Sequence, residues 1–151
     1  MLLGISEILA KYSDLRTRQE KVDWLKKHDS YALRSILKGA YDPNIEWDLP
    51  KDDPEYKPNP YLDQESMLYK ESKRLYLFTK TGNPNLTQEK KLKLFVALLE
   101  TVSKEDAVLL LHMRDRKLPY VGLTIKNINL AFENLIPVET AKDISTENEN
   151  D

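Results

Sequence analysis

Five prolines lie between positions 43 and 60, and they set the strongest limit on how this chain can fold. Proline has no backbone N–H and its ring clashes with the preceding helical turn, so a regular helix cannot run through this stretch and strand pairing is disfavoured. On both sides of it, apolar residues recur at helical spacing. The pattern predicts an all-α fold, a compact bundle of about six to seven short helices with one long proline-rich acidic loop at residues 41–64.

Residues that favour helix N-termini precede most of the apolar runs. Thr17 and Glu20 have the spacing of a capping box, in which each side chain bonds to the backbone N–H of the other. The other expected capping residues are Ser6, Asp29 or Ser30, Thr87, Ser103 and Thr124. One further helix is predicted from Gln64 to Thr79. In the helix after Thr87, Phe95 is predicted to face the core, and Lys90, Lys91 and Lys93 are predicted to face solvent.

The length of 151 residues predicts one domain, residues 1–137, followed by a polar acidic tail at 138–151 that is predicted to be disordered. The chain has no cysteine, which excludes disulfides and thiolate metal sites and suits a reducing cytoplasm. The N-terminal apolar run is too short for a signal peptide. No apolar run approaches the roughly 20 residues that span a bilayer. We therefore expect a cytoplasmic protein with no membrane partner.

The formal net charge of −2 hides an uneven distribution. Residues 65–132 carry 12 Lys and Arg against 7 Asp and Glu, whereas residues 42–64 carry 2 against 7. The helical scaffold is thus basic, and the loop and the tail are acidic. A dedicated duplex binder is usually more basic overall, because its affinity grows with the number of phosphates it neutralises. The acidic segments could screen the basic face, or could themselves face a partner.

The most informative chemistry lies in residues 109–135, which are predicted to form the end of one helix, a short basic connection and a second helix. Pro119 prevents the first helix from continuing, Gly122 allows a positive φ, and Thr124 suits an N-cap. A helix N-terminus presents free N–H groups and a partial positive charge, which suits a phosphate. The cations around it are Arg114, Arg116, Lys117 and Lys126. The pattern fits either a sequence-neutral phosphate clamp or an ordinary helix–turn–helix corner with solvated charges.

A resemblance bears on this choice. The sequence MRDRKLPYVGLTIKNINLAF resembles the close of the DNA-binding domain of ATP-dependent DNA ligases, although KLPYVG is longer than the usual connection of that family. The residues that carry the likeness are Arg114, Asp115, Gly122, Thr124, Ile128 and Phe132. A second likeness, to the same domain in large tailed-phage ligases, lies at Lys80, Thr81, Gly82 and Asn83 and at the helix start Ser103 to Asp106. The resemblance covers roughly residues 5 to 137.

This resemblance implies a stand-alone DNA-binding module of a tailed phage, acting in phage DNA metabolism in the host cell cytoplasm. It would contact the backbone of duplex DNA without reading bases. The implied contact residues are Lys80, Gly82, Asn83, Arg114, Arg116, Lys117, Gly122, Thr124, Lys126 and Asn127. The Lys-x-Asp-Gly motif that supplies the ligase nucleophile does not occur in this sequence, so the resemblance implies no ligase chemistry.

Aromatic residues are spaced through the proline-rich segment, at Tyr41, Trp47, Tyr56 and Tyr61. Long loops without secondary structure are uncommon in compact domains and are often functional. The four side chains can be interpreted in two ways. They either pin the loop onto the helices, or they act with the acidic residues as anchors for a partner. The second interpretation predicts an alternative function, a phage-encoded interaction factor that engages a host or phage protein through this loop and the basic helical face.

Catalytic residue patterns are absent from the sequence. His28 and His112 are the only histidines, and neither has the spacing of a metal ligand. No two carboxylates form a recognisable catalytic pair, and the four glycines are too scattered for a nucleotide-binding loop. We therefore expect no enzyme activity, no cofactor and no metal site.

Overall fold

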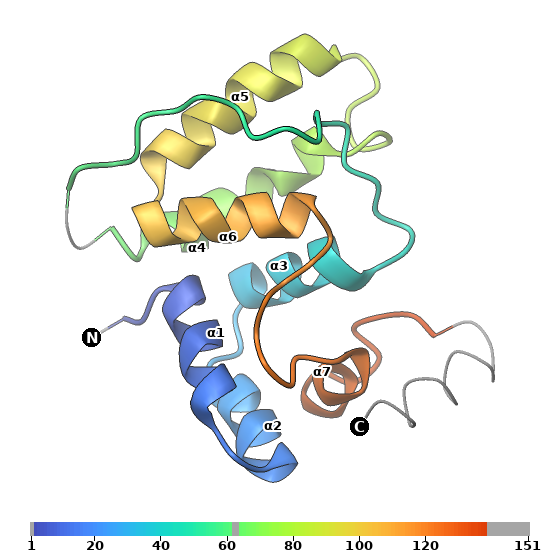
Figure 1. The fold of residues 1–151 in the computed structure, drawn as a ribbon. Helices are drawn as coiled ribbons and strands as arrows, with labels where there is room; N and C mark the ends of the chain where they lie inside the picture. Colours follow the sequence, from blue (N-terminus) through green and yellow to red (C-terminus); the bar gives the residue numbers. More distant parts are fainter. Residues whose placement is uncertain (1, 62–63, 139–151) are drawn as a thin grey trace.

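The computed structural model describes residues 2–61 and 64–138 (Figure 1). Over these residues the fold is all-α, as the sequence predicts. The helices are, in order, α1 (Ile5–Asp14), α2 (Arg18–Lys27), α3 (Tyr31–Tyr41), α4 (Met67–Glu71), the 3₁₀ helix η1 (Ser72–Phe78), α5 (Gln88–Thr101), α6 (Lys104–Arg114) and α7 (Ile125–Ala131). The described part of the segment between α3 and α4 contains no helix. The predicted disordered tail lies, from residue 139 onward, outside the described residues.

Local capping interactions begin most of these helices where the sequence predicts. Thr17 and Glu20 form the predicted capping box at α2. The side chains of Ser30, Thr87, Ser103 and Thr124 each accept a hydrogen bond from the backbone N–H three residues further on. α1 differs from the prediction, because its N-cap is Gly4 rather than Ser6. The Asp106 carboxylate of α6 instead accepts a hydrogen bond from the Ser6 N–H, so a distant part of the chain supplies this cap.

The helix predicted from Gln64 to Thr79 is instead a short α-helix, α4, that continues as η1. A 3₁₀ helix has three residues per turn, so every third side chain lies on the same side. Ser72, Leu75 and Phe78 follow this spacing, and all three are buried. The tighter winding therefore aligns all three toward the core, whereas in an α-helix, at 3.6 residues per turn, Phe78 would be rotated by about 120° from Ser72.

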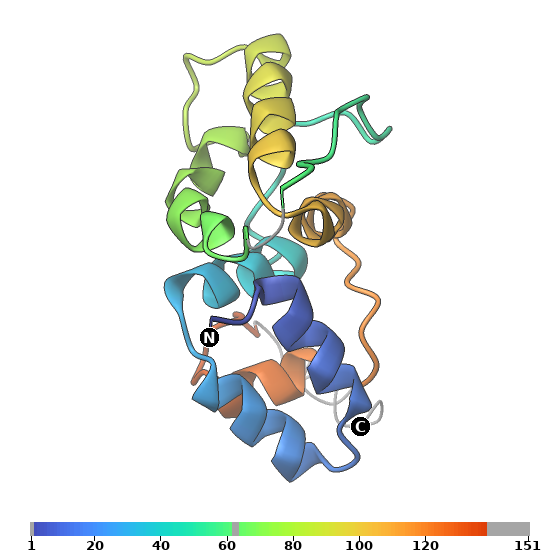
Figure 2. The same ribbon diagram turned by 90° about the vertical axis from the view of Figure 1, so that its left-hand side faces the viewer.

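The central helix of the molecule is α6, which packs against α1, α3 and α5. At one end α1, α2 and α7 lie together, and at the other end α5 packs against η1 (Figure 2). The core between them is aliphatic. Its fully or almost fully buried side chains include Leu33, Ile36 and Leu37 of α3 and Leu109, Leu110 and Met113 of α6. Burial of each such side chain stabilises the fold by roughly 1.5–3 kcal/mol.

A hydrogen-bond network joins α1 and α2 to the connection between α6 and α7. The Tyr12 hydroxyl donates to Gly122 O at 2.7 Å. Lys21 Nζ donates to Tyr12 O at 2.9 Å and to Val121 O at 3.3 Å, and it lies 4.7 Å from the centre of the Tyr12 ring. Gly122 has the predicted positive φ, +76°, and a Cβ at this position would lie 2.9 Å from Lys21 Cε. Both the backbone conformation and the packing therefore require glycine here.

Tyr41, at the C-terminal end of α3, makes a related contact, because its hydroxyl donates to Leu123 O at 3.2 Å. Burial raises the pKa of Tyr41 from 10.0 to about 12, and the neighbouring Tyr12 acts in the same direction. The folded state thus keeps the phenol protonated at pH values where the unfolded chain loses the proton. The contribution to stability is complete below pH 10 and is lost as the pH rises through about 12.

We expect Tyr41→Phe to be less stable than the native protein at pH 8 by about 1 kcal/mol, because one hydrogen bond is lost. This difference in the free energy of unfolding should shrink between pH 10 and pH 12, because the Tyr41 phenol ionises more readily in the unfolded chain than in the folded one. Tyr41→Phe lacks this phenol and loses no stability through it. Urea unfolding at pH 8 and pH 11 measures both free energies. An equal difference at the two pH values would contradict the assigned role of Tyr41.

Candidate functional site

Residues predicted for DNA binding and for partner binding meet in one groove, beside the C-terminal end of α6. We refer to residues 42–61, the described part of the proline-rich segment, as the loop. The loop runs in an extended conformation across α5 (Figure 1). A groove of about 570 Å³ lies along its first half. Trp47, Lys80, Arg114 and Arg116 all line this groove.

Arg116, which was predicted to bind phosphate, binds the loop and α3 instead. Its guanidinium donates to Gly39 O at 3.1 Å, to Ile45 O at 2.7 Å and to Asp42 O at 2.6 Å. Burial lowers the pKa of Arg116, and the charge of Asp42 acts in the opposite direction. The prediction is wrong for this residue for a physical reason. Its guanidinium adds a charged donor to three carbonyl groups near the junction of α3 and the loop, two of which, Gly39 O and Asp42 O, also accept N–H groups of Trp47 and Ile45.

Arg116 also closes the end of α6 in an unusual backbone conformation. Its φ is +62°, which is the left-handed conformation that glycine usually takes just after a helix. Its N–H donates to Met113 O at 2.9 Å, as expected for such a helix end. The hydrogen bonds of the side chain hold the residue in this conformation, which costs an L-residue about 1–2 kcal/mol.

Arg114 is also turned inward, with only 3% of its side chain exposed. Its Nη2 contacts the carboxylates of Asp53 at 2.5 Å and Asp115 at 2.8 Å, and its Nη1 donates to Asp52 O at 3.3 Å. Burial alone lowers the pKa of Arg114, but the hydrogen bonds and charges of Asp53 and Asp115 outweigh it, and the pKa is raised. The predicted phosphate contact is therefore wrong here too, because Asp52 and Asp53 of the acidic loop bind the Arg114 guanidinium.

Lys91 of α5 is a third cation that holds the loop, and the prediction that it faces solvent is wrong because its side chain is buried. Its side chain is 2% exposed, and Nζ contacts Asp48 Oδ2 at 2.8 Å and Thr79 O at 3.0 Å. Next to it the loop forms a short antiparallel bridge between Trp47 and Thr79. The sequence contains a signal for this burial. Lys91 lies four residues before the buried Phe95, which places both on the same face of α5.

The predicted elbow around Gly122 and Thr124 is occupied by contacts within the chain. Thr124 Oγ1 accepts the N–H of Asn127, as its capping role requires. The Asn127 side chain is buried and donates to Gly122 O at 2.9 Å and to the Tyr12 hydroxyl at 3.3 Å. Asn127 is therefore a structural residue, which corrects its assignment to DNA binding. Gly122 and Lys117 are exposed, and Lys126 is partly exposed.

The turn after η1 holds the remaining predicted DNA contacts. Lys80 keeps 59% of its side chain exposed and lies 3.3 Å from a Glu46 carboxylate oxygen. The Gly82 N–H donates to Thr79 Oγ1 at 2.9 Å, and a Cβ on Gly82 would lie 2.1 Å from Tyr76 O. Glycine is therefore needed at this position to close the turn. Asn83 is partly exposed beside it.

The four aromatic residues of the predicted partner site have different environments. Trp47 Nε1 donates to Gly39 O at 2.9 Å, and Tyr41 bonds to Leu123 O. Both side chains, together with that of Tyr56, are partly buried against the hydrophobic core. Trp47 and Tyr56 pin the loop onto the helices, which is the first of the two interpretations, whereas Tyr41 belongs to α3 and bonds to the connection between α6 and α7. Tyr61 alone among the four is strongly exposed, with 73% of its surface accessible.

With the loop and its anchors in view, the chain can be compared with known proteins. The model of a family of unknown function, DUF6433, matches residues 8–120. The chain belongs to this family. The matched residues run from α1 to the connection after α6, so they include the loop and the three cations that hold it. Neither the curated proteins nor the solved structures contain a match, and the resemblance to ligase DNA-binding domains stays a prediction.

Over residues 2–61 and 64–138, no three His, Cys, Asp or Glu side chains are grouped so that they could hold a metal ion. Within the same ranges, no helix has the length and apolar character needed to cross a membrane.

We expect Arg116→Ala to lower the free energy of unfolding by about 3 kcal/mol, because three carbonyl groups lose a charged donor. Arg116→Gly should be about 1 kcal/mol less destabilising, since glycine accepts the positive φ without strain. Both variants should be cleaved faster within the loop by a protease. The matched control is Lys117→Ala, an exposed neighbour expected to change stability by less than about 0.5 kcal/mol. If Arg116→Ala and Lys117→Ala unfold alike in urea, Arg116 does not hold the loop.

Proposed function

We propose that this protein is a binding module whose loop docks a protein partner. The observation that supports the proposal is the number of interactions that hold the loop in one shape. Arg114, Arg116 and Lys91 bond to it, Glu100 accepts the Lys57 N–H at 2.7 Å, and the Asn59 side chain donates to Thr101 O at 2.8 Å. A loop that is already in its bound conformation loses little entropy on docking, so such preorganisation favours affinity.

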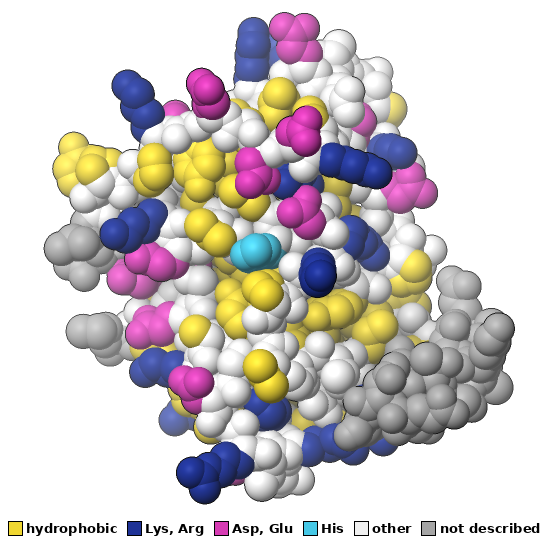
Figure 3. Space-filling view, viewed as in Figure 1, with side chains coloured by type: hydrophobic (Ala, Val, Ile, Leu, Met, Phe, Trp, Pro, Cys, Tyr) yellow, Lys and Arg dark blue, Asp and Glu magenta, His cyan; other side chains and the backbone are white. Residues whose placement is uncertain are grey.

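The outer side of the loop indicates the chemistry of the partner. Asp52, Asp53 and Glu55 are exposed along it, and Tyr61 is exposed near its end. Figure 3 shows Asp and Glu side chains over the upper part of the face that carries α6, with Lys and Arg side chains among them. An acidic surface with an accessible aromatic ring suits a basic partner segment that offers an apolar or cationic group to the ring.

Duplex DNA is the second candidate ligand, and exposed lysines outside the predicted corner favour it. Lys70, Lys73, Lys80, Lys90 and Lys93 are all exposed on the segment from α4 to α5. These side chains could neutralise backbone phosphates without reading bases. The inward orientation of Arg114 and Arg116 removes two of the predicted contacts, and the acidic loop lies beside the remaining ones. The protein partner is therefore the better supported of the two.

Site-specific photo-crosslinking tests the protein-binding proposal in the cells where the protein naturally acts. A photo-reactive phenylalanine analogue replaces the exposed Glu55 of the loop or, as a matched control, the exposed Glu89 of α5. We expect a discrete adduct from position 55 and none from position 89. The adduct should be lost when Asp52→Lys is added, because the charge on the loop is reversed. Equal labelling from both positions, or none from position 55, would contradict the proposal.

Electrophoretic retardation of intact and nicked duplexes at low salt tests the second candidate. If DNA binds the α4–α5 side, Lys90→Glu combined with Lys93→Glu should weaken retardation about tenfold or more, because each phosphate contact contributes a salt-dependent term. Lys26→Glu combined with Lys27→Glu, on the exposed side of α2, is the matched control. Absence of retardation at micromolar protein rejects DNA binding. If both double variants lose retardation equally, the binding depends on net charge alone and not on the α4–α5 side.

A further inference from the structure

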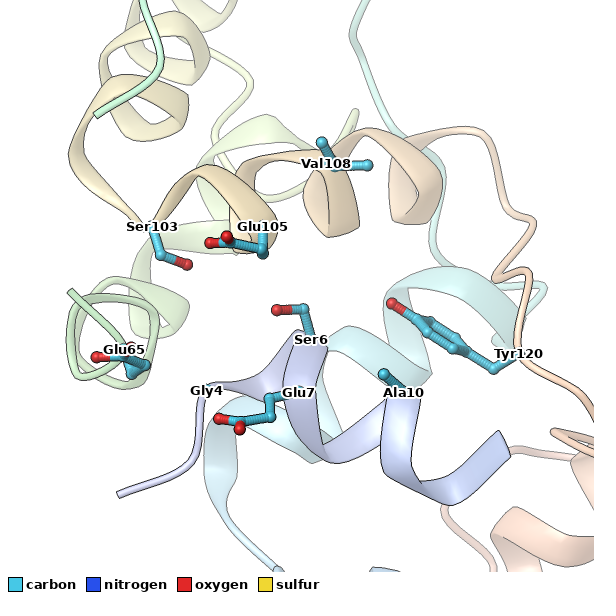
Figure 4. Close-up of a pocket in the computed structure, with 9 residues that line it drawn as sticks. All are labelled: Gly4, Ser6, Glu7, Ala10, Glu65, Ser103, Glu105, Val108 and Tyr120. Carbon is cyan, nitrogen blue, oxygen red and sulfur yellow. The ribbon is translucent and has the colours of Figure 1, made fainter. Parts of the chain in front are cut away.

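An acidic hollow of about 640 Å³ opens between the N-terminal ends of α1 and α6. None of the residues that line it also lines the loop groove. Three carboxylates border it, those of Glu7, Glu65 and Glu105. Figure 4 shows the hydroxyls of Ser6 and Ser103 facing each other across the gap between the two helices. Glu65 lies at one end of the hollow in this view and Tyr120 at the other.

One side of the hollow is apolar. Ala10, Val108 and the ring of Tyr120 line it, and Val108 exposes 47% of its surface although it lies between buried residues of α6. Gly4 keeps the floor open, since a Cβ there would lie 3.3 Å from Glu65 Cγ and 3.7 Å from Asp106 Oδ2. The hollow thus offers carboxylates and hydroxyls next to a surface that suits methylene groups.

A buried carboxylate behind this floor is incompletely satisfied. Asp106 is 0% exposed, and its Oδ1 accepts the Ser6 N–H at 3.0 Å. Its Oδ2 has no hydrogen-bond partner among the described residues and is directed toward Gly4, which lines the hollow. Burial raises the pKa of Asp106, while hydrogen bonds from Ser6 and Ser103 act in the opposite direction. A cation in the hollow would offset the cost of burying this charge.

We propose that this hollow binds a primary ammonium group carried on an alkyl chain. Three surrounding carboxylates and the buried Asp106 attract a cation, the two serine hydroxyls accept its N–H groups, and the apolar side contacts its methylenes. Anionic ligands such as phosphates are repelled by the same charges. The described carboxylates are not grouped as metal ligands, which favours an elongated organic cation over a divalent ion. The same chemistry occurs in the lysine side chain of a partner protein and in a free polyamine.

The experiment is an amide NMR titration of the full chain with butylammonium, which reproduces the lysine side chain, and with 1-butanol as its neutral counterpart. We expect butylammonium alone to shift the amides of residues 4–7, 65, 103–108 and 120. Separate titrations give the Kd for spermidine and for N-acetyl-lysine methylamide. The ligand with the lower Kd indicates whether the site takes a polyamine or a peptide lysine. Shifts of equal size with 1-butanol, or butylammonium shifts spread over other acidic surfaces, overturn the proposal.

Matched variants test the assigned carboxylates. Glu105→Gln and Glu65→Gln should each raise the Kd for butylammonium about fivefold at low salt, since each removes one negatively charged partner of the ammonium group. Glu89→Gln, which removes a charge from the exposed side of α5, is the control and should leave the Kd unchanged. Circular dichroism and the melting temperature verify that each variant is folded. Equal Kd values for Glu105→Gln, Glu65→Gln and Glu89→Gln would show that the hollow is not the site.

Discussion

Hydrogen bonds to the loop from the buried Arg114 and Lys91 and the partly buried Arg116 are the interactions on which the rest of this structure depends. A proline-rich extended segment cannot satisfy its own carbonyl groups, and each one left buried without a donor costs about 1–3 kcal/mol. Arg114 at the end of α6 and Arg116 just after it donate to loop carbonyl groups, and Lys91 of α5 bonds to the carboxylate of Asp48 in the loop. The dependence runs in both directions. A buried cation is tolerated only when it is paired and hydrogen-bonded, so the helices also need the loop.

The same contacts explain the uneven charge of the sequence. Basic residues of 65–132 and acidic residues of the loop meet in the folded chain, where the buried Lys91 pairs with Asp48 and the buried Arg114 with Asp53. A basic scaffold in the sequence is therefore not a free basic surface in the molecule. This difference changes the functional argument, because cations that neutralise the protein's own loop are not available to a polyanion.

Features that depend on a few neighbouring residues could be predicted. The N-caps at Thr17, Thr87 and Thr124 were identified because a capping side chain and the N–H that donates to it lie within three residues. Gly122 could be identified as a residue that allows a positive φ because glycine has no Cβ, and its φ is positive. Features that depend on distant groups could not be predicted in the same way. An arginine in a basic run looks the same whether it meets a phosphate or a backbone carbonyl, and the two predicted phosphate contacts at Arg114 and Arg116 failed for this reason.

The sequence by itself determined the helical class, the beginnings of most helices and the absence of helix in the proline-rich segment, because these follow from apolar spacing, local caps and the covalent geometry of proline. The tertiary structure alone decided which charges are buried and which remain on the surface. The groups that decide this lie far apart in the chain, 43 residues for Lys91 and Asp48 and 77 for Arg116 and Gly39. No local pattern reports whether such groups meet, since their contact exists only after the helices have packed.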